Sequence, residues 1–129
     1  MIWFVAIGGA VGSVARFLVA VLIQRWSGST FPAGTLLINI SGSFLLGFLM
    51  RYALGTSSIT PEVRALLTTG FCGGYTTFST FSYDSIMLME SGQVGRAGFY
   101  VVLSVGASLL AAVAGIAAAH ALLAFRTRA

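Results

Sequence analysis

The sequence predicts an all-α membrane protein with four transmembrane helices, the third of them broken near its middle. Of the 129 residues, 57% are hydrophobic and 8% are charged, whereas a soluble domain usually carries about 25% charged residues. Seven basic and three acidic residues are too few to cover a water-facing surface. Lipid is therefore the expected solvent for most of the exterior. Four long apolar stretches, and a glycine-rich string within the third, supply the rest of this prediction.

Each predicted helix reaches the length of about 20 mostly apolar residues that a membrane-spanning helix requires. The helices are expected over about residues 2–24, 34–54, 63–90 and 95–125. Pro32 and Pro61 lie just before the second and third helices, where proline is tolerated, and Ser91-Gly92 marks the turn before the fourth. We expect one transmembrane domain over residues 1–129 and no domain outside the membrane.

The charges do not favour nucleic acid as a partner. The net charge is +4, but the arginines are scattered singly along the chain, which is typical of membrane anchoring. Four of them fall on the predicted side of the two termini and two on the other side, so the topological bias is weak. A chain of this kind could insert into the bilayer in both orientations.

Residues 70–82, in the middle of the third predicted helix, read GFCGGYTTFSTFS. Two adjacent glycines followed by hydroxyl residues are poor helix formers. In lipid, freed backbone groups persist only where protein, ion or water satisfies them, and broken helices near the midplane are typical of ion and substrate sites. We expect a break around residues 73–77. The alternative is a glycine notch that only packs against a neighbouring helix.

Polar residues inside membrane helices are costly and therefore candidates for function. Asn39 lies near the centre of the second helix and shares a face with Thr35, Gly42 and Ser43. Its amide offers two N–H donors. This stripe either lines a pore or holds two helices together by hydrogen bonds, and the residues alone leave both interpretations open.

Two phenylalanines of the third helix, Phe78 and Phe81, share a face, with Ser79 and Thr80 displaced around the helix between them. The edge of an aromatic ring is electropositive. Edge-on rings could line an anion path without a full charge, which would hold the ion too firmly for it to leave. The alternative is ordinary packing.

The fourth helix carries hydroxyl groups at intervals of four residues, on Tyr100, Ser104 and Ser108. They could donate to an anion, or they could bond to carbonyls of their own helix. Arg16 lies about 10 Å inside the first helix. Its side chain either snorkels to the interface or attracts anions at a vestibule.

An enzyme is not expected. The chain has one cysteine and one histidine, and it shows no nucleophile–base–acid set, no cluster of metal ligands and no phosphate-binding loop.

Three strings together resemble the Fluc (CrcB-type) fluoride channels. Residues 8–17, GGAVGSVARF, resemble the glycine-rich first helix of that family, which ends in an arginine and an aromatic residue. Gly34-Thr35-Leu36, followed by Asn39, Gly42, Phe44 and Gly47, resembles its second-helix signature. Residues 70–82 resemble its third-helix signature almost throughout. The one departure is Asp84, where a glutamate is expected, and this change should matter little.

The resemblance implies a passive, fluoride-selective channel that exports fluoride across the bacterial inner membrane, as a multi-pass protein, and lowers cytoplasmic fluoride. It further implies an antiparallel, dual-topology homodimer with two pores and a structural sodium ion on its axis. The fluoride pore would be lined by Asn39, Phe78, Phe81, Ser79, Thr80, Tyr100, Ser104, Ser108 and Thr35. Arg16 would lie at a vestibule, and the backbone carbonyls of Gly73 and Thr76 would bind sodium.

Two other functions remain open from the residues. One is a small dual-topology multidrug or cation transporter, which would be expected to use a membrane-embedded carboxylate for proton coupling. The first, second and fourth helices contain no acid. The other is a membrane assembly protein that transports nothing and is held by its small-residue faces.

Overall fold

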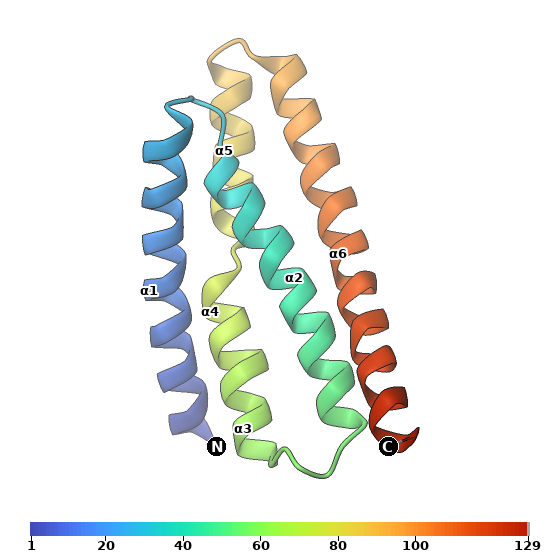
Figure 1. The fold of residues 1–129 in the computed structure, drawn as a ribbon. Coiled ribbons are helices and arrows are strands. Elements are labelled where there is room, and N and C mark those ends of the chain that lie inside the picture. Colours follow the sequence, from blue (N-terminus) through green and yellow to red (C-terminus); the bar gives the residue numbers. More distant parts are fainter. Residues whose placement is uncertain (129) are drawn as a thin grey trace.

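The computed structural model describes residues 1–128, and helices make up the secondary structure of this part of the chain, as predicted. Three helices are long and apolar enough to cross a membrane: α1 (Ile2–Ser27), α2 (Ala33–Leu54) and α6 (Val94–Arg128). Between α2 and α6 the chain forms α3 (Pro61–Ala65), the π-helix η1 (Leu66–Cys72), α4 (Gly73–Tyr75) and α5 (Phe78–Glu90). These shorter elements run in succession through the bundle, and both chain ends lie at the same end of the molecule (Figure 1).

The helix ends extend slightly beyond the apolar stretches, because polar residues continue a helix as readily as apolar ones. The first helix, predicted to end near residue 24, continues to Ser27 and stops where Gly28 adopts a left-handed conformation with φ 56°. Glycine accepts that conformation without the steric cost of a Cβ. The third segment begins with Pro61 in the first turn, and the Thr60 side chain caps it by accepting a hydrogen bond from the Val63 amide.

Glycines bring neighbouring helices into backbone contact. A Cβ added at Gly12 of α1 would overlap the carbonyl oxygen of Phe71, so α1 lies directly against η1. A Cβ added at Gly47 of α2 would overlap the carbonyl oxygen of Ala112, and one at Gly115 would overlap that of Phe44. The lower halves of α2 and α6 are therefore closely packed, as small residues allow in lipid.

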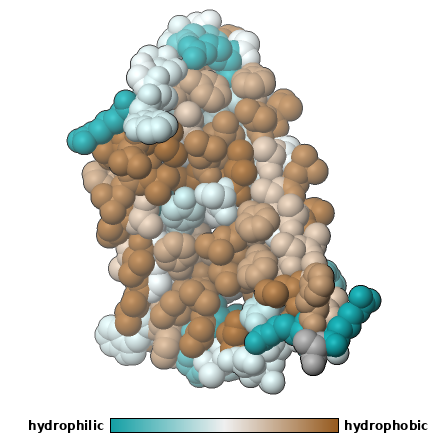
Figure 2. Space-filling view, viewed as in Figure 1, coloured by the Kyte–Doolittle hydropathy of each residue, from teal (hydrophilic) through white to brown (hydrophobic). Residues whose placement is uncertain are grey.

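The exterior is apolar over most of its height. Figure 2 shows hydrophobic residues across the middle of one face, hydrophilic residues at its two ends and a small pale patch near its centre. Large side chains such as Trp3, Leu110 and Phe125 are exposed. The buried cluster is small and is built around Leu36, Leu88, Ala97 and Tyr100. Such a surface suits a lipid environment and not water.

Candidate functional site

The site is organised around two residues that do not continue the helix. Thr76 (φ −78°, ψ 159°) and Thr77 (φ −152°, ψ 118°) are extended and separate α4 from α5. Thr77 also begins α5, because its hydroxyl accepts a hydrogen bond from the Thr80 amide at 3.2 Å. The Thr76 amide still bonds to the Cys72 carbonyl oxygen at 3.0 Å, as in a helix. The peptide groups of Thr77 have no helical partner and need others.

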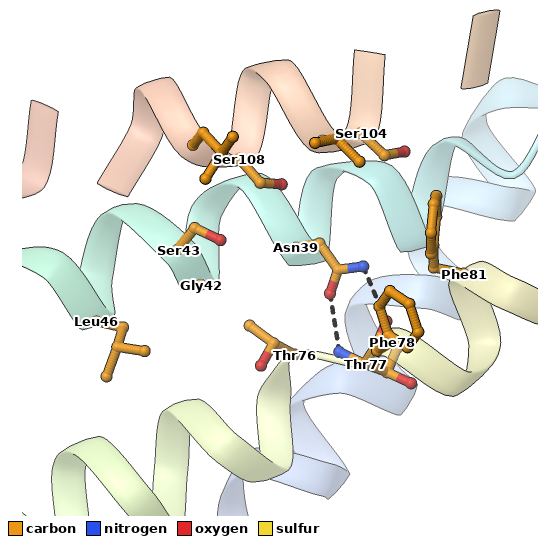
Figure 3. A pocket seen from close by; sticks show the side chains of 12 residues that line it. Asn39, Gly42, Ser43, Leu46, Thr76, Thr77, Phe78, Phe81, Ser104 and Ser108 are labelled. Atoms are coloured by element: carbon orange, nitrogen blue, oxygen red, sulfur yellow. Dashed lines mark hydrogen bonds between the residues drawn. The ribbon is translucent and has the colours of Figure 1, made fainter. Parts of the chain in front are cut away.

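Asn39 of α2 supplies those partners for Thr77. Its Nδ2 donates to the Thr77 carbonyl oxygen at 2.9 Å, and its Oδ1 accepts from the Thr77 amide at 2.8 Å (Figure 3). The two bonds fix which end of the amide faces which group, because only the nitrogen can donate to a carbonyl. Of the two N–H groups on Nδ2, one serves this pair and the other stays available.

A groove with a volume of about 310 Å³ lies beside this pair. Its walls come from α2, α6, the extended residues and the start of α5 (Figure 3). The lining residues are Asn39, Gly42, Ser43, Leu46, Thr76, Thr77, Phe78, Phe81, Ser104, Val105, Ser108 and Leu109. The groove thus combines an amide, hydroxyl groups and aromatic rings with apolar side chains, and the lining contains no charged residue.

Ser104 is the most informative of the lining residues. Its side chain is 5% exposed, and its hydroxyl has no hydrogen-bond partner among residues 1–128. A buried hydroxyl without a partner costs free energy, so such groups are rare, and a bound water or ion is one explanation for them. Ser108 lines the groove one turn further along α6. Two members of the predicted hydroxyl stripe therefore face the groove.

The two phenylalanines predicted for the site both line the groove. Their ring centroids are 5.5 Å apart, and the rings are tilted by 46°. Phe81 packs against Tyr100 at 5.4 Å, whereas Phe78 is 78% exposed and has little behind it in this chain. Phe81 thus has a packing role in addition to any other, and Phe78 has much less of one.

Thr35 and Tyr100 lie outside the groove lining and meet Asp84 instead. One carboxylate oxygen of Asp84 accepts hydrogen bonds from the Thr35 hydroxyl at 2.9 Å and from the Tyr100 hydroxyl at 3.3 Å. These three residues join α2, α5 and α6. An acid inside a membrane segment is itself a signal for function or for pairing, so Asp84 could have been identified as a candidate from the sequence.

The remaining predicted residues surround the break. Ser79 and Thr80 are exposed and do not line the groove; their hydroxyls lie 3.2 and 3.1 Å from the Thr77 hydroxyl. Arg16 reaches the break from α1, where one guanidinium nitrogen is 3.4 Å from the Thr76 carbonyl oxygen. Gly73 is exposed, with open space where a Cβ would lie.

Several lining residues had no signal in the sequence. Leu46, Val105 and Leu109 are apolar residues in apolar helices, and nothing distinguishes them from lipid-facing neighbours. Thr77 fell within the predicted break, but its pairing with Asn39 is a tertiary contact that spacing cannot reveal. Within the described residues 1–128, no group of three or more His, Cys, Asp and Glu side chains could hold a metal ion.

The chain is similar to known proteins over most of its length. Residues 3–116 match the family described as "CrcB-like protein, Camphor Resistance (CrcB)". A protein of Rhizobium meliloti (strain 1021) named "Fluoride-specific ion channel FluC" is 48% identical over 121 residues, which is 94% of this chain and 97% of the relative. Proteins with the same name from Geobacter sulfurreducens and Chlorobaculum tepidum are 47% and 50% identical, over 92% and 81% of this chain and 95% and 82% of their own lengths.

Proposed function

The chain belongs to the CrcB-like family, and we propose that it is a passive, fluoride-selective channel of the bacterial inner membrane that lowers cytoplasmic fluoride. The observation that carries the proposal is the uncharged groove with a buried hydroxyl, that of Ser104, left without a partner. The names of relatives 47–50% identical to this chain supply the identity of the ion.

The donors available in the groove suit a small, strongly hydrated anion. Fluoride must exchange its hydrating water for other hydrogen-bond donors as it moves. The second N–H of Asn39 and the hydroxyls of Ser104 and Ser108 can replace some of these water molecules. The ring edges of Phe78 and Phe81 add weaker electropositive contacts. None of these groups carries a full charge, so none binds the anion too firmly for conduction.

The transmembrane unit of this proposal has four spans. The segment from α3 to α5 forms the third span in the order of the chain and contains the break, between α2 and α6. Its backbone would be tolerated in lipid because Asn39 satisfies both peptide groups of Thr77. A complete pore also needs cover for Phe78, which is 78% exposed although it lines the groove.

We propose that a second, oppositely inserted copy of the chain packs over the exposed Phe78. The near balance of arginines between the two sides permits both orientations. A two-fold axis in the membrane plane would create two grooves and therefore two pores. It would also bring the two breaks together, and Gly73, which is exposed with open space around it, would allow the backbones to approach.

A structural sodium ion on that axis completes the proposal. The extended conformation of Thr76 directs its carbonyl away from a helical partner, and carbonyl oxygens suit a hard cation. The carbonyls of Thr76 and Gly73 from each copy would hold the ion, and its charge would offset their mutual repulsion. Arg16 donates a long hydrogen bond, 3.4 Å, to the same Thr76 carbonyl and would have to share that oxygen with the ion.

Ion efflux from liposomes that contain only the purified protein tests the function. We expect fast fluoride efflux that needs no proton gradient, and far slower chloride efflux. Equal chloride efflux would refute selectivity. Strict dependence on a pH gradient would instead favour the small transporter, and no flux of any ion would favour the assembly protein. Replacing sodium with a large organic cation during purification should lower dimer stability and flux, and no change would refute the sodium site.

A further inference from the structure

A second pocket lies at the end of the molecule opposite the chain termini, between the α1–α2 connector and the first turns of α6. Its volume is about 350 Å³, and Phe31, Gly95, Arg96 and Phe99 line it. The Arg96 guanidinium lies over the Phe31 ring, 5.7 Å from its centroid, and donates to the Gln93 side-chain oxygen at 2.6 Å. Both partners are electrically neutral, so these contacts orient the arginine without neutralising its charge.

This pocket continues the polar face of α6 that lines the groove. Arg96, Tyr100, Ser104 and Ser108 follow one another at intervals of four residues, so each lies one turn beyond the last and is rotated from it by about 40° around the helix. At 1.5 Å per residue, Arg96 lies about 12 Å along the helix axis from Ser104. The positive charge thus lies about two turns from the buried hydroxyl along the same helix, towards the end of the molecule.

Aromatic rings connect the two pockets on the same side. Phe31 meets Tyr100 edge to face at 5.6 Å, Tyr100 meets Phe81 at 5.4 Å, and Phe81 meets Phe78 at 5.5 Å. Arg96 lies over the Phe31 ring at one end of this row, and Phe81 and Phe78 at the other end line the groove. The geometry therefore leads from a fixed cation to the uncharged donors.

We propose that Arg96 collects anions at the mouth of the conduction path on this side, a role that rests on the proposed channel function. A unit positive charge about 7 Å from an anion in water raises the local anion concentration roughly threefold. Because the charge lies at the mouth, it increases the rate of entry without trapping an ion inside the groove. The stacking on Phe31 keeps the guanidinium at the entrance, whereas a free arginine would spread its charge over a larger volume.

The test compares initial fluoride efflux for Arg96→Gln and Arg25→Gln in liposomes of neutral lipid. Arg25 lies in the last turn of α1 at the same end of the molecule, is exposed, and is absent from both pocket linings, so it controls for the loss of one surface charge. At about 10 mM ionic strength, Arg96→Gln should reduce efflux about threefold, and Arg25→Gln should leave it unchanged. Arg96→Lys, which keeps the charge, should restore most of the rate.

Salt separates an electrostatic role from a structural one. The screening length falls from about 30 Å at 0.01 M to about 3 Å at 1 M, so potassium sulfate at high concentration should bring Arg96→Gln and the unmodified protein to the same rate. The inference is overturned if the Arg96→Gln deficit persists in high salt, if Arg25→Gln loses as much, or if Arg96→Gln loses nothing. Absence of fluoride efflux from the unmodified protein would overturn the channel function itself, which is a different result.

Discussion

The Asn39→Asp substitution separates the two roles that the structure gives to Asn39, which supports the break and lines the groove. Aspartate keeps an oxygen that can accept from the Thr77 amide, but it loses the nitrogen that donates to the Thr77 carbonyl. A buried carbonyl without its donor costs about 1–3 kcal/mol. The retained hydrogen bond becomes charge-assisted and gains about 1 kcal/mol in compensation. The other carboxylate oxygen, however, takes the place of Nδ2 and repels the Thr77 carbonyl oxygen, which cancels this compensation. The expected loss of folding stability is therefore about 1–3 kcal/mol.

The effect on conduction should be much larger. A carboxylate about 4 Å from an anion, at an effective dielectric constant of about 20, repels it by about 4 kcal/mol. Since 1.36 kcal/mol is a factor of ten, fluoride flux should fall by about a thousandfold. Asn39→Ala provides the matched neutral control. It removes both hydrogen bonds to Thr77 and so should lose more stability than Asn39→Asp, but it adds no charge and should keep more flux.

Two measurements on each variant decide the matter: thermal unfolding in detergent, and fluoride efflux per folded protein in liposomes. The reasoning requires opposite rankings, with Asn39→Asp the more stable variant and Asn39→Ala the more conductive one. If Asn39→Asp conducts within tenfold of the unmodified protein, the amide does not lie on the ion path and Asn39 is a structural residue only.

Four further substitutions test the groove and its scaffold. Phe78→Ile and Phe81→Ile keep apolar bulk and remove the electropositive ring edge; flux should fall with little change in unfolding temperature, and the reverse pattern would assign the rings to packing. Ser104→Ala removes a buried hydroxyl that has no partner, so stability should stay level or rise by about 1 kcal/mol while efflux slows; unchanged efflux would exclude this hydroxyl from the path. Gly12→Val would force α1 away from the Phe71 carbonyl and should cost about 1–3 kcal/mol in detergent unfolding, and a neutral result would contradict the observed close contact.

The fold class could be predicted from the sequence because it depends on properties that each segment carries by itself. Apolar length and composition identify the long helices without reference to their neighbours, and their ends were misplaced by only a few residues. The glycines and threonines of residues 73–77 likewise mark a weak point in a helix. The structure places the extended backbone at Thr76 and Thr77, after the glycines, because both glycines are accommodated in the short helix α4.

The site was less predictable, because helical spacing shows which residues share a face but not what that face meets at each depth. Thr35 and Asn39 are one turn apart on α2, yet Thr35 bonds to Asp84 while Asn39 bonds to the backbone of Thr77. Tyr100 and Ser104 differ in the same way on α6. The two residues of each pair are about 6 Å apart along the helix axis, so they contact different neighbouring segments. Only the packed structure distinguishes the hydroxyl that is satisfied from the one that is not.

The break and the groove can be understood as one hydrogen-bonding arrangement. Interrupting the helix frees peptide groups that lipid cannot satisfy. Asn39 uses its side-chain oxygen and one N–H to bond to the amide and the carbonyl of Thr77. What faces the groove is the remainder: a single N–H of that amide, the unpartnered hydroxyl of Ser104 and uncharged neighbours. Replacing Asn39 with a charged donor would satisfy the same carbonyl but would also hold an anion strongly. If the chain conducts fluoride as proposed, the neutral amide would both satisfy the break and leave only weak donors for the ion, which is the condition for an anion to enter a buried path and leave it again.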